Sequence, residues 1–457
     1  MIAVGGNPVV EISTYEVAYP DIVHPLIDEK FQVKEKYILL LEHFVNLFAD
    51  VNIKKSSSYR LDTLSKILLG TSIVNLVETY NSVGGEVVSG SGKFKSPIFK
   101  LTSYRHLFLF DALFILGIDN EKIGNCICEE ILKLTNVRFH KSLKEMTRKM
   151  YSDDCMLIER KTITPEMLKS WKDARNYLTS NKRRITFTAT MSAGKSTLIN
   201  ALIGQTLSFS KKSACTSTVL KFLTSPCKTQ EFCVVDNDDV SFVSAQEVRA
   251  YTNSLTKPCE IMGYFDSILS TQRVEVIDTP GVNSSLNPEH KKITREELRN
   301  GTDILVYVIP VEYYGSEDDY NHLVYIKKNV SYNNILFAIN MMDSCDLEDD
   351  SIDEIVCQVK NHLSEIGFEN PCVCPLSAKA GGLLKKAVMG IELSDNDKAE
   401  CKVFKSKFND EELQLEKYYP SFNLKKDNWG DNLLWQAFVS TGLPGFEALL
   451  YQYVREE

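Results

Sequence analysis

The fold is decided by the stretch Ile185-Thr-Phe-Thr-Ala-Thr-Met-Ser-Ala-Gly-Lys-Ser-Thr-Leu-Ile-Asn-Ala-Leu-Ile-Gly204. Its first residues, up to Thr188, are β-branched or aromatic and predict a short strand. Small residues then predict a turn, and the apolar residues after Lys195 predict a helix. A helix that begins directly after such a turn can bind phosphate, because its free N–H groups converge on the anion and its dipole adds positive potential. The stretch therefore predicts a phosphate-binding loop.

The loop fits the pattern G-x-x-x-x-G-K-[ST] at Gly194, Lys195 and Ser196, with Ala189 in the place of the first glycine. We expect Lys195 to reach the β- and γ-phosphates of a nucleotide and the Ser196 hydroxyl to hold Mg²⁺. Ala189 is small enough to be compatible with binding. A positive φ at this position would nevertheless be strained, because alanine carries a Cβ atom.

The composition is that of an ordinary globular protein, with 44% hydrophobic and 25% charged residues among 457. At about 150 residues per domain, this length predicts two to four domains. No apolar run approaches the roughly 18–20 residues of a transmembrane helix, and the N-terminus shows no secretory signal. The twelve cysteines form no C-x-x-C pair, which favours reduced thiols over a zinc site. We therefore expect a cytoplasmic protein, and the net charge of −9 argues against nucleic-acid binding.

Residues 1–164 are predicted to form a mainly α-helical N-terminal domain, because apolar residues recur at helical spacing along much of this region. Thr164 and Pro165 are typical of a helix N-cap followed by proline at the first helical position, and they begin a linking helix over 165–181. Glycines and serines over 81–97 predict a loop or hairpin. This region contains no motif that carries chemistry. The helical segments are expected at 34–51, 61–80, 107–116, 121–134 and 143–150.

Residues 165–457 are predicted to form a nucleotide-binding domain of the α/β class. Strands and helices alternate here, which is typical of a mostly parallel sheet covered by helices. The apolar cores of the strands are nearly continuous, as expected for strands buried on both faces. A charged, poorly periodic insertion over about 385–435 interrupts the pattern, and a helix over 438–453 closes it. Besides the first strand, strands are expected at 231–235, 273–277, 303–309, 334–339 and 372–376.

Two further motifs follow predicted strands and complete a nucleotide site. In Asp278-Thr-Pro-Gly281, the carboxylate can hold Mg²⁺ through water, and the glycine lets a backbone N–H approach a γ-phosphate. In Asn340-Met-Met-Asp343, the second carboxylate can accept hydrogen bonds from N1–H and the 2-amino group of guanine, a donor pair that adenine lacks. Each motif alone could be an ordinary turn. Their order at the carboxyl ends of predicted strands, where open α/β sheets bind ligands, predicts a guanine-nucleotide site.

The loop Ser377-Ala-Lys379 can approach the base from its other edge. With these motifs, the chain from about 184 to 453 resembles the GTPase domain of dynamin-like proteins, particularly the bacterial ones. The segment 440–447 is also similar to the start of the family's last GTPase-domain helix. The resemblance implies a P-loop GTPase that hydrolyses GTP to GDP and phosphate with Mg²⁺, stimulated by dimerisation of GTPase domains. The nucleotide-binding residues it implies are Ser192, Ala193, Gly194, Lys195, Ser196, Thr197, Gly281, Asn340, Asp343, Ser377, Ala378 and Lys379.

The resemblance also implies catalytic roles for Ser192, Lys195 and Thr216. Ser192 matches the serine that helps to position a charge-compensating monovalent cation, K⁺ or Na⁺, in dynamins. Thr216 matches the switch-I threonine that binds Mg²⁺ and positions the attacking water, with Thr218 as the alternative. The implied Mg²⁺ ligands are thus Ser196, Thr216 and Asp278.

Two departures from the family pattern affect what we expect of the chemistry. Met191 stands where many relatives have a polar residue, which favours slow or partner-dependent hydrolysis. Met341 replaces the lysine of Asn-Lys-x-Asp, which favours weaker affinity with guanine selectivity retained through Asp343. A GTP-gated interaction module with little or no hydrolysis is therefore an alternative. Asn340 and Asp343 argue against a third reading, a P-loop ATPase.

The partners expected are GTP or GDP, a second GTPase domain of the same chain, and a partner protein bound through the N-terminal helical domain. Dynamin-like proteins usually carry a helical stalk after the GTPase domain, whereas this sequence stops just past the last expected helix. Either the N-terminal domain replaces the stalk, or the stalk lies on another polypeptide or was removed. Peripheral membrane association is implied by the family alone, since no basic amphipathic stretch supports it.

Overall fold

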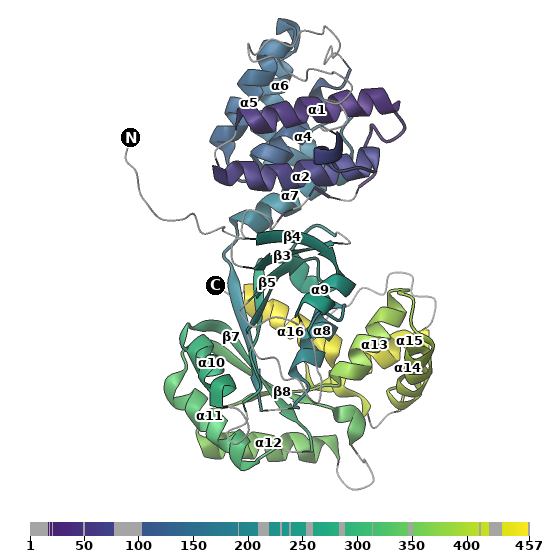
Figure 1. Ribbon diagram of the computed structural model, residues 1–457. Helices are drawn as coiled ribbons and strands as arrows, with labels where there is room; N and C mark the ends of the chain where they lie inside the picture. The colour runs from purple at the N-terminus through teal and green to yellow at the C-terminus, as the bar shows by residue number, and fades with distance from the viewer. Residues whose placement is uncertain are drawn as a thin grey trace. The chain divides into compact units, whose positions relative to one another are not determined.

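The computed structural model describes residues 17, 19–20, 22–48, 51–76, 103–190, 192–208, 219–228, 231–236, 239–252, 259–282, 288–312, 314–345, 351–410, 413–419 and 432–455. The chain folds into two compact units (Figure 1). The first comprises Met1–Ser180 with Ser225–Thr229, and the second comprises Asn181–Thr224 with Gln230–Glu457. The division therefore falls after the linking helix over 165–181, which packs with the first unit, and not before it.

The first unit is helical, as predicted, and is built around α4. Every residue of this helix from Leu107 to Leu116 is buried, and all of them except Asp111 are apolar, so the helix is not amphipathic. The side chain of Thr164 accepts a hydrogen bond from the Met167 N–H and caps α7, which confirms the predicted N-cap. The predicted loop over 81–97 lies outside the described residues. The elements are α1 (Phe31–Leu47), α2 (Val51–Leu69), α4 (Arg105–Leu116), α5 (Glu121–Leu134), η2 (Val137–Phe139), α6 (His140–Met150), η3 (Asp153–Leu157) and α7 (Pro165–Thr179).

One carboxylate lies inside the core of this helical unit. Asp111 of α4 accepts hydrogen bonds from the hydroxyls of Tyr19 and Tyr37, at 2.7 and 2.5 Å, and lies 3.1 Å from His24 Nε2. All four side chains are buried. Burial, followed by the charge of Asp111, raises the pKa of both tyrosines, so the hydroxyls stay protonated and continue to donate. These contacts hold the segment before α1 against α4.

Among its described residues, the second unit contains a nine-stranded sheet with the order β4-β3-β5-β2-β6-β1-β7-β8-β9. β1 pairs in parallel with β6 and β7, and β8 pairs in parallel with β7 and β9. β2 is parallel to β5 but antiparallel to β6, and β3 is antiparallel to both β4 and β5. The sheet is mostly parallel, as predicted, although β2, β4 and β5 were not predicted. The strands are β1 (Arg183–Ala189), β2 (Leu220–Thr224), β3 (Glu231–Asp236), β4 (Asp239–Ser244), β5 (Cys259–Gly263), β6 (Val274–Asp278), β7 (Thr302–Pro310), β8 (Tyr332–Asn340) and β9 (Cys372–Pro375).

Helices cover both faces of this sheet (Figure 1). One group comprises α8, α13 and α16, which contact one another, and the other comprises α10, α11 and α12. The connections β6–α10–β7, β7–α11–β8 and β8–α12–β9 each join parallel strands, which requires a crossover helix. The elements are α8 (Lys195–Ile203), α9 (Ala245–Thr252), η4 (Ile268–Thr271), α10 (Pro288–Arg299), α11 (Glu317–Asn329), η5 (Met342–Ser344), α12 (Ile352–Ile366), α13 (Ala378–Val388), α14 (Asp395–Lys407), η7 (Leu415–Tyr418), α15 (Asn432–Ser440) and α16 (Leu443–Arg455).

The region 385–435, predicted to be a poorly periodic insertion, contains the end of α13, all of α14 and the start of α15. Within α14 only Cys401 and Phe404 are buried, so the apolar stripe is too narrow to give a clear helical period. Both residues nevertheless join the same hydrophobic core as the sheet. The Ser394 side chain caps α14 by accepting from the Asp397 N–H, a local signal that the prediction overlooked.

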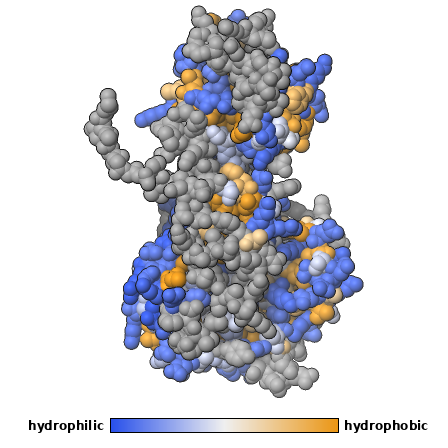
Figure 2. Space-filling model, viewed as in Figure 1, coloured by the Kyte–Doolittle hydropathy of each residue, from blue (hydrophilic) through white to orange (hydrophobic). Residues whose placement is uncertain are grey.

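The described surface shown in Figure 2 is largely hydrophilic, with hydrophobic residues in scattered patches. Among the helices that the structure describes, none combines the length and the apolar character needed to cross a membrane.

Candidate functional site

The phosphate-binding loop leaves β1 at Ala189 and enters α8 at Lys195. Ala189 is a buried residue of the strand and does not have a positive φ, so the strain expected from a missing glycine does not arise. The left-handed positions are instead Ser192, with φ 62°, and Gly194, with φ 79°. A Cβ atom on Gly194 would lie 2.3 Å from Nδ2 of Asn340. Glycine is therefore required there both for its backbone conformation and for space.

Lys195, Ser196 and Asp278 meet at the carboxyl ends of β1 and β6, which are adjacent parallel strands. The Lys195 ammonium pairs with Oδ1 of Asp278, and the Ser196 hydroxyl donates to Oδ2 at 3.0 Å. Burial lowers the pKa of Lys195 to about 7, while the neighbouring Asp278 carboxylate favours the charged ammonium. The three predicted residues thus form one buried charged cluster at the N-terminus of a helix.

Ser208 is a fourth member of this cluster that the sequence did not reveal. Its buried hydroxyl donates to Oδ2 of Asp278 at 2.7 Å. The side chain of Asn200 in α8 holds this position, because its Oδ1 accepts from the N–H groups of Leu207 and Ser208 and its Nδ2 donates to the Ser208 carbonyl. The available signal was weak: a polar serine lies among apolar residues shortly after the P-loop helix.

The segment after Asp278 is attached directly to the phosphate-binding strand. The hydroxyl of Thr279 donates to the carbonyl of Phe187 at 2.8 Å, and the N–H of Val282 donates to the carbonyl of Ala189 at 3.0 Å. Gly281, which precedes Val282, is thereby held beside the start of the P-loop. In addition, the Thr294 hydroxyl of α10 donates to the Pro280 carbonyl at 2.8 Å.

Asn340 connects the candidate base site to the phosphate site. Its Nδ2 donates to the carbonyl of Ala193 in the P-loop at 3.0 Å, and its Oδ1 accepts from the N–H of Ala378 at 2.9 Å. Asp343 lies nearby, where the Ser377 hydroxyl donates to its Oδ1. The motifs of β1, β8 and β9 are thus brought together at one edge of the sheet.

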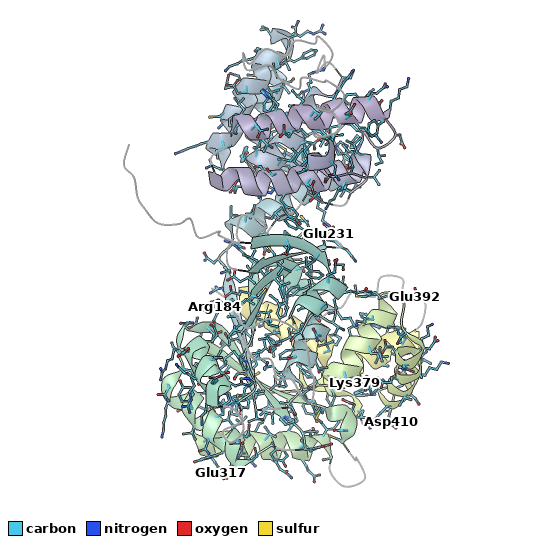
Figure 3. All side chains as sticks on the ribbon, viewed as in Figure 1. Arg184, Glu231, Glu317, Lys379, Glu392 and Asp410 are labelled. Carbon is cyan, nitrogen blue, oxygen red and sulfur yellow. The ribbon has the colours of Figure 1, made fainter. Side chains whose placement is uncertain are left out.

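The remaining predicted base-site residues are supported by α14. Lys379 (labelled in Figure 3) pairs with Glu400 at 2.9 Å, and the Lys407 ammonium donates to the backbone carbonyl of Asp343 at 2.7 Å. Met341 has a left-handed backbone, with φ 68°. Its Cε lies 3.3 Å from the position that a Cβ atom on Gly194 would take, so the methionine side chain packs against the P-loop.

Some predicted residues are not positioned. Met191, Thr216 and Thr218 lie outside the described residues. Thr197 is half-buried in the first turn of α8, and the Ser192 side chain is exposed. In the part of the chain that the structure describes, no group of three His, Cys, Asp or Glu side chains could hold a metal ion. A metal at this site would therefore depend on Asp278 and hydroxyl groups.

A family model and several solved structures are similar to parts of this chain. Residues 185–339 match the family model described as the dynamin family. A chain from an oligomerised bacterial dynamin pair, described as a mechanism for long-range sensing and tethering of membranes, is 14% identical with a TM-score of 0.36, over 85% of this chain and 70% of that chain. Era in complex with MgGDPNP and nucleotides of 16S ribosomal RNA is 15% identical with a TM-score of 0.26, over 46% and 55%. The G domain of the T. maritima FeoB iron transporter is 17% identical with a TM-score of 0.25, over 43% and 89%. No curated protein matches the chain.

The family match extends from β1 to β8 and therefore includes the phosphate-binding loop, Asp278 and the strand that ends at Asn340. It covers the mostly parallel part of the sheet on which these residues meet. Over residues 185–339, this domain is therefore similar to the dynamin family of P-loop GTPases.

Proposed function

We propose that the second unit binds GTP and hydrolyses it to GDP and phosphate with Mg²⁺. The observation that carries this proposal is the meeting of Lys195, Ser196 and Asp278 at the carboxyl ends of β1 and β6. The hydrogen bond from Asn340 to the Ala193 carbonyl supports the proposal, because it joins the end of β8 to the same P-loop. Phosphate and base sites adjoin along one sheet edge, which is where open α/β sheets bind nucleotides.

The residues present fit a magnesium ion. Mg²⁺ prefers hard oxygen ligands and is usually held by one or two carboxylates together with substrate phosphates. Asp278 supplies the carboxylate, and two hydroxyls, those of Ser196 and Ser208, lie within hydrogen-bond distance of its Oδ2. We assign Ser196 and Asp278 to the ion, with Thr216 as the third ligand implied by the family. When bound, Mg²⁺ would offset the negative charge of the β- and γ-phosphates.

Hydrolysis in such a site depends on positioning and charge stabilisation. A water oxygen forms a bond to the γ-phosphorus as the bond to the β–γ bridging oxygen breaks, and GDP leaves. Lys195 would release Asp278 and bind the β- and γ-phosphates. The backbone N–H of Gly281 would donate to the γ-phosphate, and Thr216 would orient the water. The exposed side chain of Ser192 would be accessible to a monovalent cation or to a second GTPase domain.

Guanine selectivity is assigned to Asp343, whose carboxylate would accept from N1–H and the 2-amino group of the base. The Ser377 hydroxyl orients this carboxylate, and Lys407 holds the backbone carbonyl of the same residue. Asn340 and Ala378 maintain the loop geometry. Lys379 would lie along the base, although it is paired with Glu400 here.

The decisive experiment measures phosphate release from GTP and from ATP by the full chain. We expect Mg²⁺-dependent turnover of GTP alone, loss of turnover in Lys195→Ala, and no change in Lys292→Ala, which alters an exposed lysine of α10. In Asp343→Asn the preference should move to xanthine nucleotide, because an asparagine amide can donate to the 2-oxo group. Equal turnover of ATP, or full activity in Lys195→Ala, would contradict the proposal.

Dimerisation of GTPase domains and a partner bound by the helical unit rest on the family resemblance. Turnover per molecule that rises with protein concentration, together with a larger particle in the presence of a transition-state mimic, would support the first. The alternative function is a GTP-gated interaction module with little hydrolysis, which the apolar Met191 in the P-loop favours. Tight GTP binding without turnover at high protein concentration would select that alternative.

A further inference from the structure

Two arginines of the helical unit stack on one aromatic ring, and the charge of a third acts on the first of them. Arg105, the first residue of α4, has its Cζ 3.5 Å from the centroid of the Phe139 ring. Arg138 of η2 has its Cζ 4.5 Å from the same centroid. Arg160 comes from the turn closed by the bridge between Arg160 and Ile163, and its charge acts on Arg105. We call these three residues the arginine cluster.

The arginine cluster has no acidic partner among the described residues. The carboxylate of Glu29 accepts from the hydroxyl of Tyr104, next to Arg105 in the sequence, and forms no ion pair with the three guanidinium groups. The Nε atoms of Arg105 and Arg160 are buried and have no hydrogen-bond partner. One Nη atom of Arg160 donates to the backbone carbonyl of Glu159 at 2.8 Å. Arg138 is exposed, whereas Arg105 and Arg160 are half-buried, and a buried donor without an acceptor is costly.

Two of the same arginines act on a neighbouring histidine. Burial, followed by the charges of Arg160 and Arg105, lowers the pKa of His106 to about 4. The Ser142 hydroxyl donates to the Phe139 carbonyl at 2.9 Å, so its oxygen is left to accept from Nε2 of His106, 3.2 Å away. Burial and the two other arginines likewise lower the pKa of Arg105. No carboxylate offsets these effects.

Two helix N-termini add to the positive potential. α4 begins at Arg105 and α6 at His140, and neither N-cap residue, Tyr104 or Phe139, makes a side-chain hydrogen bond to the helix. The contact between Arg105 and Phe139 shows that the two N-termini adjoin. A cation at a helix N-terminus is unfavourable, whereas an anion there is stabilised by the free N–H groups and the dipole. Stacking on Phe139 explains the positions of two of the arginines. It does not explain the position of Arg160 or why the two Nε donors lack acceptors.

We propose that the arginine cluster binds a phosphate group. Arginine suits this ligand because its planar guanidinium can donate two parallel hydrogen bonds to phosphate oxygens. An open cavity of about 480 Å³ lies alongside Arg160. It is lined by the charged residues Glu159 and Lys161 and by apolar side chains that include Met156, Ile158 and Leu168. The phosphate is therefore carried by a molecule with an apolar part. A lipid headgroup and a soluble organic phosphate share this chemistry.

The test uses the full chain, with inorganic phosphate and vesicles as probes. Phosphate is titrated while the imidazole resonances of His106 are followed by NMR, since a bound anion offsets the arginine charges and raises the pKa of His106 toward its ordinary value. We expect Arg160→Gln to weaken phosphate binding roughly ten-fold, the loss expected for a charge-assisted pair. Arg148→Gln, which changes an exposed arginine of α6, should have no effect. Lys195→Ala should also keep this response, which separates it from phosphate binding at the nucleotide site.

Vesicles distinguish the two sources of phosphate. If phosphatidylcholine vesicles that contain phosphatidic acid retain the chain, and Arg160→Gln abolishes the retention, the ligand is a lipid headgroup. If phosphate binds at His106 but the vesicles do not retain the chain, the ligand is a soluble phosphate ester. An unchanged His106 resonance at saturating phosphate, or equal binding by Arg160→Gln and the parent chain, would overturn the proposal.

Discussion

Lys385 is a buried lysine that joins three helices of the GTPase unit, and its removal should destabilise that unit strongly. From α13, its ammonium donates to the carbonyls of Ala201 and Leu202 at the end of α8, at 3.0 and 3.2 Å. It also pairs with Glu447 of α16 at 2.6 Å. The first turn of α8 forms part of the P-loop, and the first turn of α13 forms the loop beside the base. The perturbation we consider is Lys385→Met, which keeps the length of the side chain and removes the charge.

The magnitude follows from burial. The side chains of Lys385 and Glu447 are 5% and 9% exposed, so solvent screens the pair little. Removing one partner of a buried pair costs about 3–5 kcal/mol, because the other charge is left without compensation. With a urea slope of about 3 kcal/mol per molar, the unfolding midpoint of this unit should fall by about 1–1.7 M. Replacing both residues, in Lys385→Met with Glu447→Met, should recover much of the loss because no charge is left buried.

The assay is urea unfolding, with hydrogen exchange of α8 peptides to identify the GTPase unit. Burial already raises the pKa of Glu447, and loss of the ammonium raises it further. A carboxyl with a raised folded-state pKa contributes stability at low pH that is lost as pH rises through that pKa, so the deficit of Lys385→Met should be larger at about pH 8 than at about pH 5. Lys398→Met, in an exposed pair of α14, is the control and should change little. An unshifted midpoint, or a deficit that grows as pH falls, would refute this reasoning.

Three further predictions concern the nucleotide site. Gly194→Ala should abolish measurable binding of a fluorescent GTP analogue, because the alanine Cβ would lie 2.3 Å from Nδ2 of Asn340. The control is Gly390→Ala, where φ is similar but no atom lies within 4 Å of the added Cβ, and this variant should bind normally. GTP binding should take up protons above about pH 7 and weaken as pH rises, because burial lowers the pKa of Lys195 to about 7 and phosphate binding favours its ammonium. Calorimetry in two buffers of different ionisation enthalpy checks this, and no proton uptake at about pH 8 would count against it. Ser208→Ala should raise the Mg²⁺ concentration needed for GTP binding by roughly ten-fold, the value of one hydrogen bond to a charged group, because Ser208 donates to Asp278. An unchanged Mg²⁺ requirement would show that Ser208 does not support Asp278 at the metal site.

The local features of this protein could be predicted from the sequence. The strand and helix around Gly194, the cap at Thr164 and the apolar strand before Asp278 depend on residues adjacent in the chain, so their spacing reveals them. The order of the motifs was sufficient to predict a guanine-nucleotide site, because the carboxyl ends of parallel strands meet at one edge of a sheet. The roles of these residues in hydrolysis are predictions for the experiments above.

Only the tertiary structure decided which distant residues support the site. Ser208 reaches Asp278, Lys407 of α14 holds the carbonyl of Asp343, and Lys385 caps α8, all across separations that leave no periodic signal in the sequence. Hydrogen bonds between distant segments depend on how the chain packs, whereas caps and turns depend on immediate neighbours. The arginine cluster illustrates the same point, since residues of α4, η2 and a later turn become unpaired neighbours only when the helices pack together.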